Sequence, residues 1–297
     1  MLEIKQKPHL HASWIDPDAV EIVERLQKAG FTTYLVGGCV RDLLVGIHPK
    51  DYDIATNALP NEVKRKVWGS YVIGRRFRLV LVKRGEQQFE VATFRRGSKP
   101  EDFTEGEDQP VGDNFFGTPE EDALRRDFTI NALFYDPIKN ELIDYAKAMA
   151  DIEATTLRMI GDPKTRIIED PIRSLRAVRL AHKLKFSIEP SLRQAILENA
   201  SELAKSVLPR RREEYLKFMR LDDHVPALSE LYDLNLMEQL LPTLKYIWDQ
   251  PEKRELFFDY LHRMEEITID EKNPVDIYLP IILAFTKAIE NEPEWDF

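Results

Sequence analysis

Apolar positions in the first third of the chain change from a helical spacing to short runs. Residues 16–29 predict a helix, because an aspartate can cap it, a proline fits its first turn and apolar side chains recur on one face. The run 34–36 predicts a strand. A glycine pair, a helical segment, a turn and a second short strand with Asp51 and Asp53 follow it.

The pattern beyond this stretch predicts a hairpin, a loop and a second hairpin. We expect a helix at 60–68, strands at 71–73, 77–83 and 88–94, a helix starting at Thr118 that leads into 123–133, and strands at 134–136 and 142–144. Residues 97–113 are acidic and rich in Gly and Pro, which predicts a mobile flap near the site.

From residue 151 onward the pattern is helical. A helix is expected at 171–184, with Asp170 as its cap and Pro171 in its first turn. Further helices are expected near 190–205, 208–221, 225–237, 252–266 and 275–290. Strands followed by helices predict an α+β chain with a helical second half.

The two acids of the second strand suggest a metal site. In a strand, residues i and i+2 face the same way, so Asp51 and Asp53 would lie side by side with Tyr52 opposite. Paired carboxylates suit Mg²⁺, and the glycines Gly37 and Gly38 let backbone N–H groups approach an anion. Singly, each feature is also common in turns and at solvated strand ends. Glu90 either approaches this site or pairs with an arginine.

Composition limits the classes of function. The 297 residues suffice for about two domains, a single cysteine fits a reducing cytoplasm, and no apolar run is long enough for a membrane span or signal peptide. The net charge of −10 does not favour nucleic acid, but arginines are clustered. These clusters are Arg75-Arg76-Arg78, Arg95-Arg96, Arg125-Arg126, Arg173/Arg176/Arg179 and Arg210-Arg211-Arg212.

Two of these clusters stand in otherwise apolar surroundings. The charges of Arg125-Arg126-Asp127 must form ion pairs, lie at a phosphate, or both. The simpler alternative is an Arg–Asp ion pair with no catalytic role. The arginines of the 171–184 helix form either a solvated face or an anion or base site. No Ser/His/Asp, Cys/His or zinc-like spacing is visible.

Five motifs in order carry a resemblance. YLVGGCVRDLLVG with DYDIATNA, EVATFR, RRDFTINAL and EDPIRSLRAVRLA resemble the bacterial poly(A) polymerase/tRNA nucleotidyltransferase (CCA-adding) family, class II, of the DNA polymerase β-like superfamily. The resemblance covers roughly residues 15–220. It implies a nucleotidyltransferase head with a mixed, mostly antiparallel sheet flanked by helices (1–150), a helical neck (151–221) and a short helical body (222–297).

The resemblance also implies roles for individual residues. Asp51 and Asp53 would hold two Mg²⁺ ions, and Asp127 would be a third catalytic carboxylate. Contacts to the triphosphate are implied for Gly37, Gly38, Arg41, Arg126, Arg176 and Arg179. Asp170 and Arg173 would read the incoming base. Weaker RNA contacts are expected from Arg75, Arg76, Arg210, Arg211 and Arg212.

The role of the base-reading pair has a chemical logic of its own. Adenine and cytosine each present an amino donor beside a ring-nitrogen acceptor. A carboxylate accepts from the first and a guanidinium donates to the second. Guanine and uracil present the reverse order, and unpaired polar groups can reject a substrate by ~10⁴-fold or more. The expected substrates are therefore ATP and CTP.

Which member of the family the chain resembles depends on two segments. Residues 72–82, VIGRRFRLVLV, resemble the signature of poly(A) polymerases, which favours adenylation of mRNA, small RNA or tRNA 3′ ends from ATP. CCA- or A-adding tRNA repair remains the alternative, and an inactive RNA-binding relative is the third. Lys147 and Ala148 replace the glycines of the family's hinge, which argues against switching from C to A. The acidic end predicts weak, distributive RNA binding or a protein partner that supplies RNA affinity.

Overall fold

The computed structural model describes residues 4–6, 8, 10, 12–74, 79–97, 115–222, 224–242, 245–263 and 274–290. Its backbone divides into two compact units, each described here by itself. Unit 1 is Met1–Ala154 with Arg158–Ile160, and unit 2 is Thr155–Leu157 with Gly161–Phe297. The division into head, neck and body stays a prediction. The expected flap at 97–113 falls almost wholly outside the described residues.

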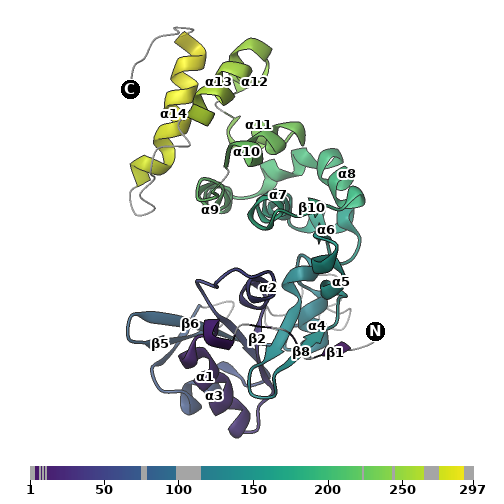
Figure 1. Ribbon diagram of the computed structural model, residues 1–297, viewed down its shortest axis with the longest axis vertical. Coiled ribbons are helices and arrows are strands. Elements are labelled where there is room, and N and C mark those ends of the chain that lie inside the picture. The colour runs from purple at the N-terminus through teal and green to yellow at the C-terminus, as the bar shows by residue number, and fades with distance from the viewer. Residues whose placement is uncertain are drawn as a thin grey trace, which may run out of the picture. The chain divides into compact units, whose positions relative to one another are not determined.

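Unit 1 is built on an eight-stranded sheet (Figure 1). The strand order is β1-β8-β7-β2-β3-β6-β5-β4, and every neighbouring pair is antiparallel apart from β3 and β6. The strands are β1 (Ile4–Gln6), β2 (Thr33–Val36), β3 (Asp53–Thr56), β4 (Ser70–Ile73), β5 (Leu79–Arg84), β6 (Gln87–Thr93), β7 (Leu133–Asp136) and β8 (Glu141–Asp144). The prediction of a mixed, mostly antiparallel sheet is confirmed.

Short helices surround this sheet. They are η1 (Ala12–Trp14), α1 (Pro17–Lys28), α2 (Gly38–Leu44), α3 (Pro60–Lys66), α4 (Pro119–Leu124), η3 (Thr129–Asn131) and α5 (Ala148–Glu153). The Asp16 carboxylate caps α1 as predicted, accepting from the N–H groups of Asp18 and Ala19. The helix predicted to lead on to residue 133 instead ends at Leu124, and a turn of 3-10 helix follows.

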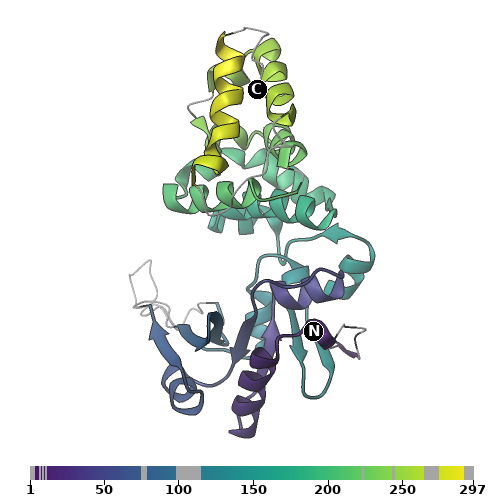
Figure 2. The ribbon, with the colours of Figure 1, turned by 60° about the vertical axis from the view of Figure 1, so that its left-hand side comes forward.

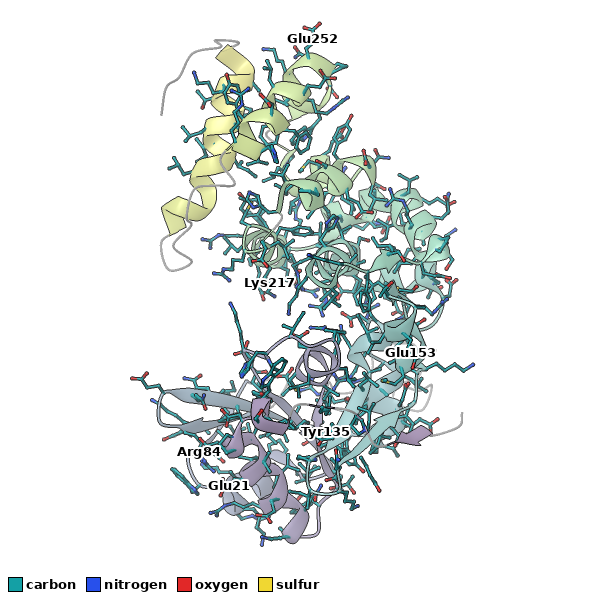
Figure 3. All side chains as sticks on the ribbon, viewed as in Figure 1. Glu21, Arg84, Tyr135, Glu153, Lys217 and Glu252 are labelled. Atoms are coloured by element: carbon teal, nitrogen blue, oxygen red, sulfur yellow. The ribbon has the colours of Figure 1, made fainter. Side chains whose placement is uncertain are left out.

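One face of the sheet is covered by helices. Ile22, Val23 and Leu26 of α1 are fully buried and pack in one cluster with Ile54 of β3 and Val80 of β5. Helices α1 and α3 lie together on this side (Figure 1). Arg84 belongs to the same face, since its guanidinium pairs with Glu21 of α1 at 3.0 Å (Figure 3). We call this side the helix face.

The register places the acidic residues on the other face. Asp53 is opposite Glu90, Glu90 is opposite Leu81, and Leu81 is opposite Tyr71. Residues directly opposite each other share a face. One row therefore crosses four strands, from Asp53 on β3 to Tyr71 on the edge strand β4. We call this side the carboxylate face.

Unit 2 is helical apart from the parallel pair β9 (Thr156–Leu157) and β10 (Ser187–Ile188). Its helices are α6 (Pro163–Glu169), α7 (Ile172–Leu184), α8 (Pro190–Glu198), η4 (Ala200–Lys205), α9 (Leu208–Phe218), α10 (His224–Asp233), α11 (Met237–Leu240), α12 (Lys245–Trp248), α13 (Pro251–Arg263) and α14 (Pro274–Glu290). The last two pack side by side (Figure 2). The helical second half is confirmed, although short helices such as α6 and α11 were not predicted.

Candidate active site

Three carboxylates gather at the start of β3. Asp53 begins the strand and Glu90 is its direct neighbour on β6. Desolvation by surrounding protein raises the pKa of Glu90, and the charges of Asp53 and Asp51 raise it further. Desolvation also raises the pKa of Asp53, where Arg126 acts in the opposite direction and Asp51 adds to the rise. Of the two alternatives for Glu90, the structure shows the approach to the acidic pair.

One detail of the predicted pair is wrong. Asp51 lies before β3, which starts at Asp53, so the two acids do not occupy one strand. The alternation around them still holds, because Tyr52 is buried on the helix face while both aspartates are exposed. The Tyr52 hydroxyl donates to the carbonyl of Trp14. This hydrogen bond holds the segment that carries Asp51 in place, although that segment is not part of β3.

The donors present suit a hard divalent cation. Within the described ranges, no group of three or more His, Cys, Asp or Glu residues is arranged to hold a metal ion by itself. Mg²⁺ does not require such a group, since it commonly takes one or two carboxylates and completes its shell with water and substrate phosphates. Burial is the main cause of the raised pKa values of Asp53 and Glu90, and repulsion between the carboxylates adds to it.

Arg126 lies beside the carboxylates, on the β2 and β7 side. Its guanidinium donates to Asp122 at 2.9 Å and to the carbonyl of Asn131 at 3.2 Å, and it lies 5.4 Å from the ring centre of Phe134 on β7. Asp122 is almost fully buried. This acid orients Arg126, and sequence reasoning did not single it out.

The glycine pair leaves room for that guanidinium. Gly37 has a φ of +74°, and a Cβ added there would meet Nη1 of Arg126 at 2.8 Å. Its backbone conformation therefore favours glycine, and a side chain there would push the end of the Arg126 side chain aside. Gly38 opens α2, which has only seven residues. The glycines and Arg126 together, more than the end of a long helix, therefore make this a candidate anion site.

Arg41 lies beneath the glycine pair as a buried support. Its guanidinium donates to Asp42 at 2.6 Å and to the side chain of Asn131, which is itself nearly buried. Asn131 in turn donates to the Asp127 carboxylate at 2.9 Å. The structure thus joins Arg41 and Asp127 through Asn131, a residue that sequence reasoning missed. The RRDFTINAL motif contained it, but no charge marked it out.

The predicted base-reading residues lie in unit 2. Asp170 does not cap α7 as expected, since the cap position is Pro171 and Asp170 ends α6. Its two carboxylate oxygens accept from the two terminal nitrogens of Arg210, each at 2.9 Å. Arg173 donates to the carbonyl of Arg166 at 2.6 Å and to Glu169 at 3.1 Å.

The other arginines of α7 are gathered by one buried acid. Glu214 of α9 is almost fully buried and accepts from Arg179 at 2.7 Å, with Arg176 at 3.7 Å and Lys217 at 3.2 Å. Lys217 also pairs with Glu213 at 2.7 Å, so two carboxylates neighbour these three cations. The arginines are therefore held in a charged cluster and are not a simply solvated face.

The residues proposed for weaker RNA contacts are used in different ways. Arg210 pairs with Asp170, and Arg211 donates to the carbonyl of Gln239 at 2.7 Å. Arg212 is exposed. Arg75 and Arg76 lie outside the described residues.

A cavity of about 550 Å³ includes Asp51 in its lining but neither Asp53 nor Glu90. Its walls come from the segment before α1, the turn before β3 and the start of β6. Trp14 and His48 line it with their rings 5.9 Å apart, and Asp51 and Gln88 lie at its border.

Family models match both units. The model described as poly A polymerase head domain matches residues 33–158, and the model described as probable RNA and SrmB-binding site of polymerase A matches residues 185–247. Together they include the carboxylates and the glycine pair. The chain belongs to the family of bacterial poly(A) polymerases and CCA-adding enzymes.

Relatives within this family carry both names. Poly(A) polymerase I of Haemophilus influenzae is 42% identical over 242 residues, 79% of this chain and 53% of that protein. A CCA-adding enzyme of Lactobacillus delbrueckii is 38% identical over 221 residues, 74% of this chain and 54% of that protein. The chain thus spans about half the length of these relatives.

Solved structures agree with this fold. The Bacillus stearothermophilus CCA-adding enzyme in complex with CTP matches with a TM-score of 0.69 and 28% identity, over 94% of this chain and 72% of that one. An apo form of a CCA-adding enzyme matches with a TM-score of 0.74 at 23% identity, over 98% and 70%. No helix in the described part of the chain is long and apolar enough to cross a membrane.

Proposed function

We propose that this chain is a template-independent nucleotidyltransferase that adds nucleotides to RNA 3′ ends, with adenylation from ATP as its main activity. The observation that carries the proposal is the group of Asp51, Asp53 and Glu90 on an open sheet face, with Arg126 and Gly37 beside it. An oxygen-rich, negatively charged group next to a fixed guanidinium suits metal-assisted phosphoryl transfer.

The transfer needs one bond exchange. The 3′-hydroxyl oxygen of the RNA attacks the α-phosphorus of the nucleotide, the bond to the β-phosphate oxygen breaks, and pyrophosphate leaves. The hydroxyl proton passes to solvent. Asp51 and Asp53 would hold two Mg²⁺ ions. When bound, the ions supply activation of the hydroxyl and charge neutralisation on the leaving group.

The residues around Arg126 would bind the triphosphate. Gly37 and Gly38 allow phosphate oxygens close to the backbone, and Arg126 would neutralise part of their charge. Arg41 and Asp127 would act by positioning Asn131, whose carbonyl accepts from Arg126. For Arg176 and Arg179 of unit 2, contacts to the triphosphate are proposed from the family resemblance, and Glu214 would hold both side chains in place.

Asp170 and Arg173 would select the base. The Arg210 fork occupies one lone pair on each Asp170 oxygen, which leaves acceptor capacity for a base amino group. Arg210 is therefore proposed as a positioning residue for Asp170. The matched description of residues 185–247 as an RNA- and SrmB-binding region supports an RNA substrate and a protein partner that adds RNA affinity.

CCA or A addition to tRNA is the second candidate. The similarity to the Bacillus stearothermophilus enzyme bound to CTP favours it, as do relatives named CCA-adding enzyme. Identity is slightly higher to the poly(A) polymerases I, at 41–42%, than to the CCA-adding enzymes, at 38–40%. The resemblance of residues 72–82 to the poly(A) polymerase signature supports the first candidate as well.

The products of the reaction separate the two candidates. We would supply labelled ATP or CTP with Mg²⁺ to a generic RNA, a tRNA lacking CCA and a tRNA ending in CC. A ladder of adenylates on the generic RNA is expected. Addition that stops after one to three nucleotides on tRNA alone would support the second candidate. No product with any of the three RNAs would indicate an inactive relative and overturn the proposal.

Alanine at Gly37 tests the proposed triphosphate site. Its Cβ would displace the Arg126 guanidinium, so we expect kcat/KM for ATP to fall by about 10²-fold, comparable to the loss of one fixed charge-stabilising donor. Gly46→Ala is the matched control, because Gly46 has a similar φ of +78° but open space around it. Gly46→Ala should lose about 1 kcal/mol in urea unfolding, and Gly37→Ala should lose more, because the ψ of −128° at Gly37 lies outside the left-handed helical region. Equal activity in the two would contradict the role given to Gly37.

A further inference from the structure

The carboxylate face of the sheet continues well beyond the acids. The row that starts at Asp53 and Glu90 runs through Leu81 to Tyr71, on the edge strand β4. Adjacent strands are about 4.8 Å apart, so Tyr71 lies about 14 Å from the β3 position of Asp53 along the sheet. The Tyr71 side chain is 59% exposed.

This outer part of the face combines apolar and basic side chains. Ile73, two residues after Tyr71, shares its face and is 42% exposed. Lys83, two residues after Leu81 on β5, also shares it and is exposed. Among the described residues, neither the Tyr71 hydroxyl nor the Lys83 ammonium makes a hydrogen bond or ion pair.

The geometry of phosphoryl transfer indicates from which side of Asp53 the RNA 3′-hydroxyl must arrive. In phosphoryl transfer the attacking and leaving oxygens lie roughly in line on opposite sides of the phosphorus. Gly37 and Arg126 lie on the β2 and β7 side of Asp53, so a triphosphate held there sends pyrophosphate to that side. The attacking hydroxyl must then come from the β6, β5 and β4 side.

We propose that the 3′ segment of the RNA primer runs across β6 and β5 to β4, with a base stacked on Tyr71 and a phosphate paired with Lys83. This inference rests on the proposed function and adds the path of the primer to it. An aromatic ring that accepts any base, next to an unpaired cation, is the arrangement by which single-stranded RNA is bound without sequence preference. The carboxylates alone would repel the RNA backbone, so a cation at this distance compensates them.

Primers of two lengths test the contact with Tyr71, because only the longer one reaches it. With a hexanucleotide primer, Tyr71→Ala should raise the KM for RNA about tenfold, while kcat and the KM for ATP stay unchanged. With a dinucleotide primer, which ends short of Tyr71, the same variant should behave like wild type. Tyr71→Phe keeps the ring and should behave like wild type with both primers.

The lysine is tested by salt dependence. Lys83→Gln should weaken binding of the hexanucleotide, measured by fluorescence anisotropy without nucleotide, and should reduce the slope of log K against log[salt] by about one. Lys64→Gln is the matched control. It removes an exposed cation from α3, on the helix face, and should leave the slope unchanged.

The outcomes separate the path from the function. Wild-type transfer with an unchanged hexanucleotide KM in Tyr71→Ala, or an equal loss with both primers, would overturn the path and leave the function standing. If wild type transferred no nucleotide, the proposed function would fail. The binding measurements would then decide the path alone, and a salt slope in Lys83→Gln equal to that of Lys64→Gln would overturn it.

Discussion

Replacement of Asp53 by asparagine is expected to lower nucleotide transfer by about 10³-fold or more while RNA binding persists. Metal assistance is worth several kcal/mol of transition-state stabilisation, and each 1.36 kcal/mol is a factor of ten in rate. Asp53 is paired across the strands with Glu90 and lies within the electrostatic reach of Arg126, so its loss would remove the central oxygen ligand of the proposed site. The measurement is kcat with saturating ATP and RNA, together with anisotropy for RNA binding.

The same substitution should make the metal-free protein more stable. The pKa of Asp53 is raised in the folded state, so its contribution favours folding below the unfolded pKa and is lost as pH rises through the folded pKa. At neutral pH the charged form therefore opposes folding, and a neutral amide in its place would remove that opposition. We expect Asp53→Asn to have the higher Tm at neutral pH without metal, and the difference to shrink in mildly acidic buffer.

Magnesium should reverse this order. A cation that binds only the folded state raises Tm, so wild type should gain from Mg²⁺ and Asp53→Asn should gain less. Glu24→Gln, a change at a partly exposed position of α1 on the helix face, is the control and should respond to Mg²⁺ like wild type. A Tm that rises equally in all three proteins would contradict a metal role for Asp53, and appreciable residual turnover would contradict its catalytic role.

The sheet around these acids was largely predictable from sequence. Period-two alternation identified the hairpin of β5 and β6, and the separation of Tyr52 from its two acidic neighbours survives in the fold. The start of β3 was not predictable, because the sequence does not show that Tyr52 is anchored to Trp14, a residue from a distant segment. Alternation describes faces of a strand and says little about where the strand begins.

Residues that act through tertiary contacts were harder to find. Asp122 and Asn131 look ordinary in sequence, and their importance lies in which guanidinium each one contacts. Asp170 shows the opposite error. Asp followed by Pro is a sound capping signal, but the carboxylate gains more from the Arg210 fork on α9, forty residues away in the chain. The helix-cap preference of an aspartate is overridden where a distant arginine offers its carboxylate two hydrogen bonds.

The Asp170–Arg210 pair leads to the second large expected effect, on the choice of base. Asp170→Ala should reduce the preference for ATP over UTP and GTP from ~10⁴-fold to about tenfold, because no carboxylate remains to accept from an amino group or to oppose a carbonyl. The loss should appear in the ratio of kcat/KM values, measured for each nucleotide separately with the same RNA.

Folding should survive this change, which makes the result interpretable. The Arg210 side chain is 52% exposed, and an exposed ion pair is worth only ~0–1 kcal/mol. Asp162→Asn is the control, since it removes a negative charge near the start of α6, keeps the cap and does not touch the pair.

If wild type already incorporates UTP as well as ATP, and Asp170→Ala leaves that ratio unchanged, Asp170 does not read the base. Arg210→Ala should then be silent too. If Asp170 does read the base, Arg210→Ala should relax selectivity part of the way, because the carboxylate remains but its orientation is no longer fixed.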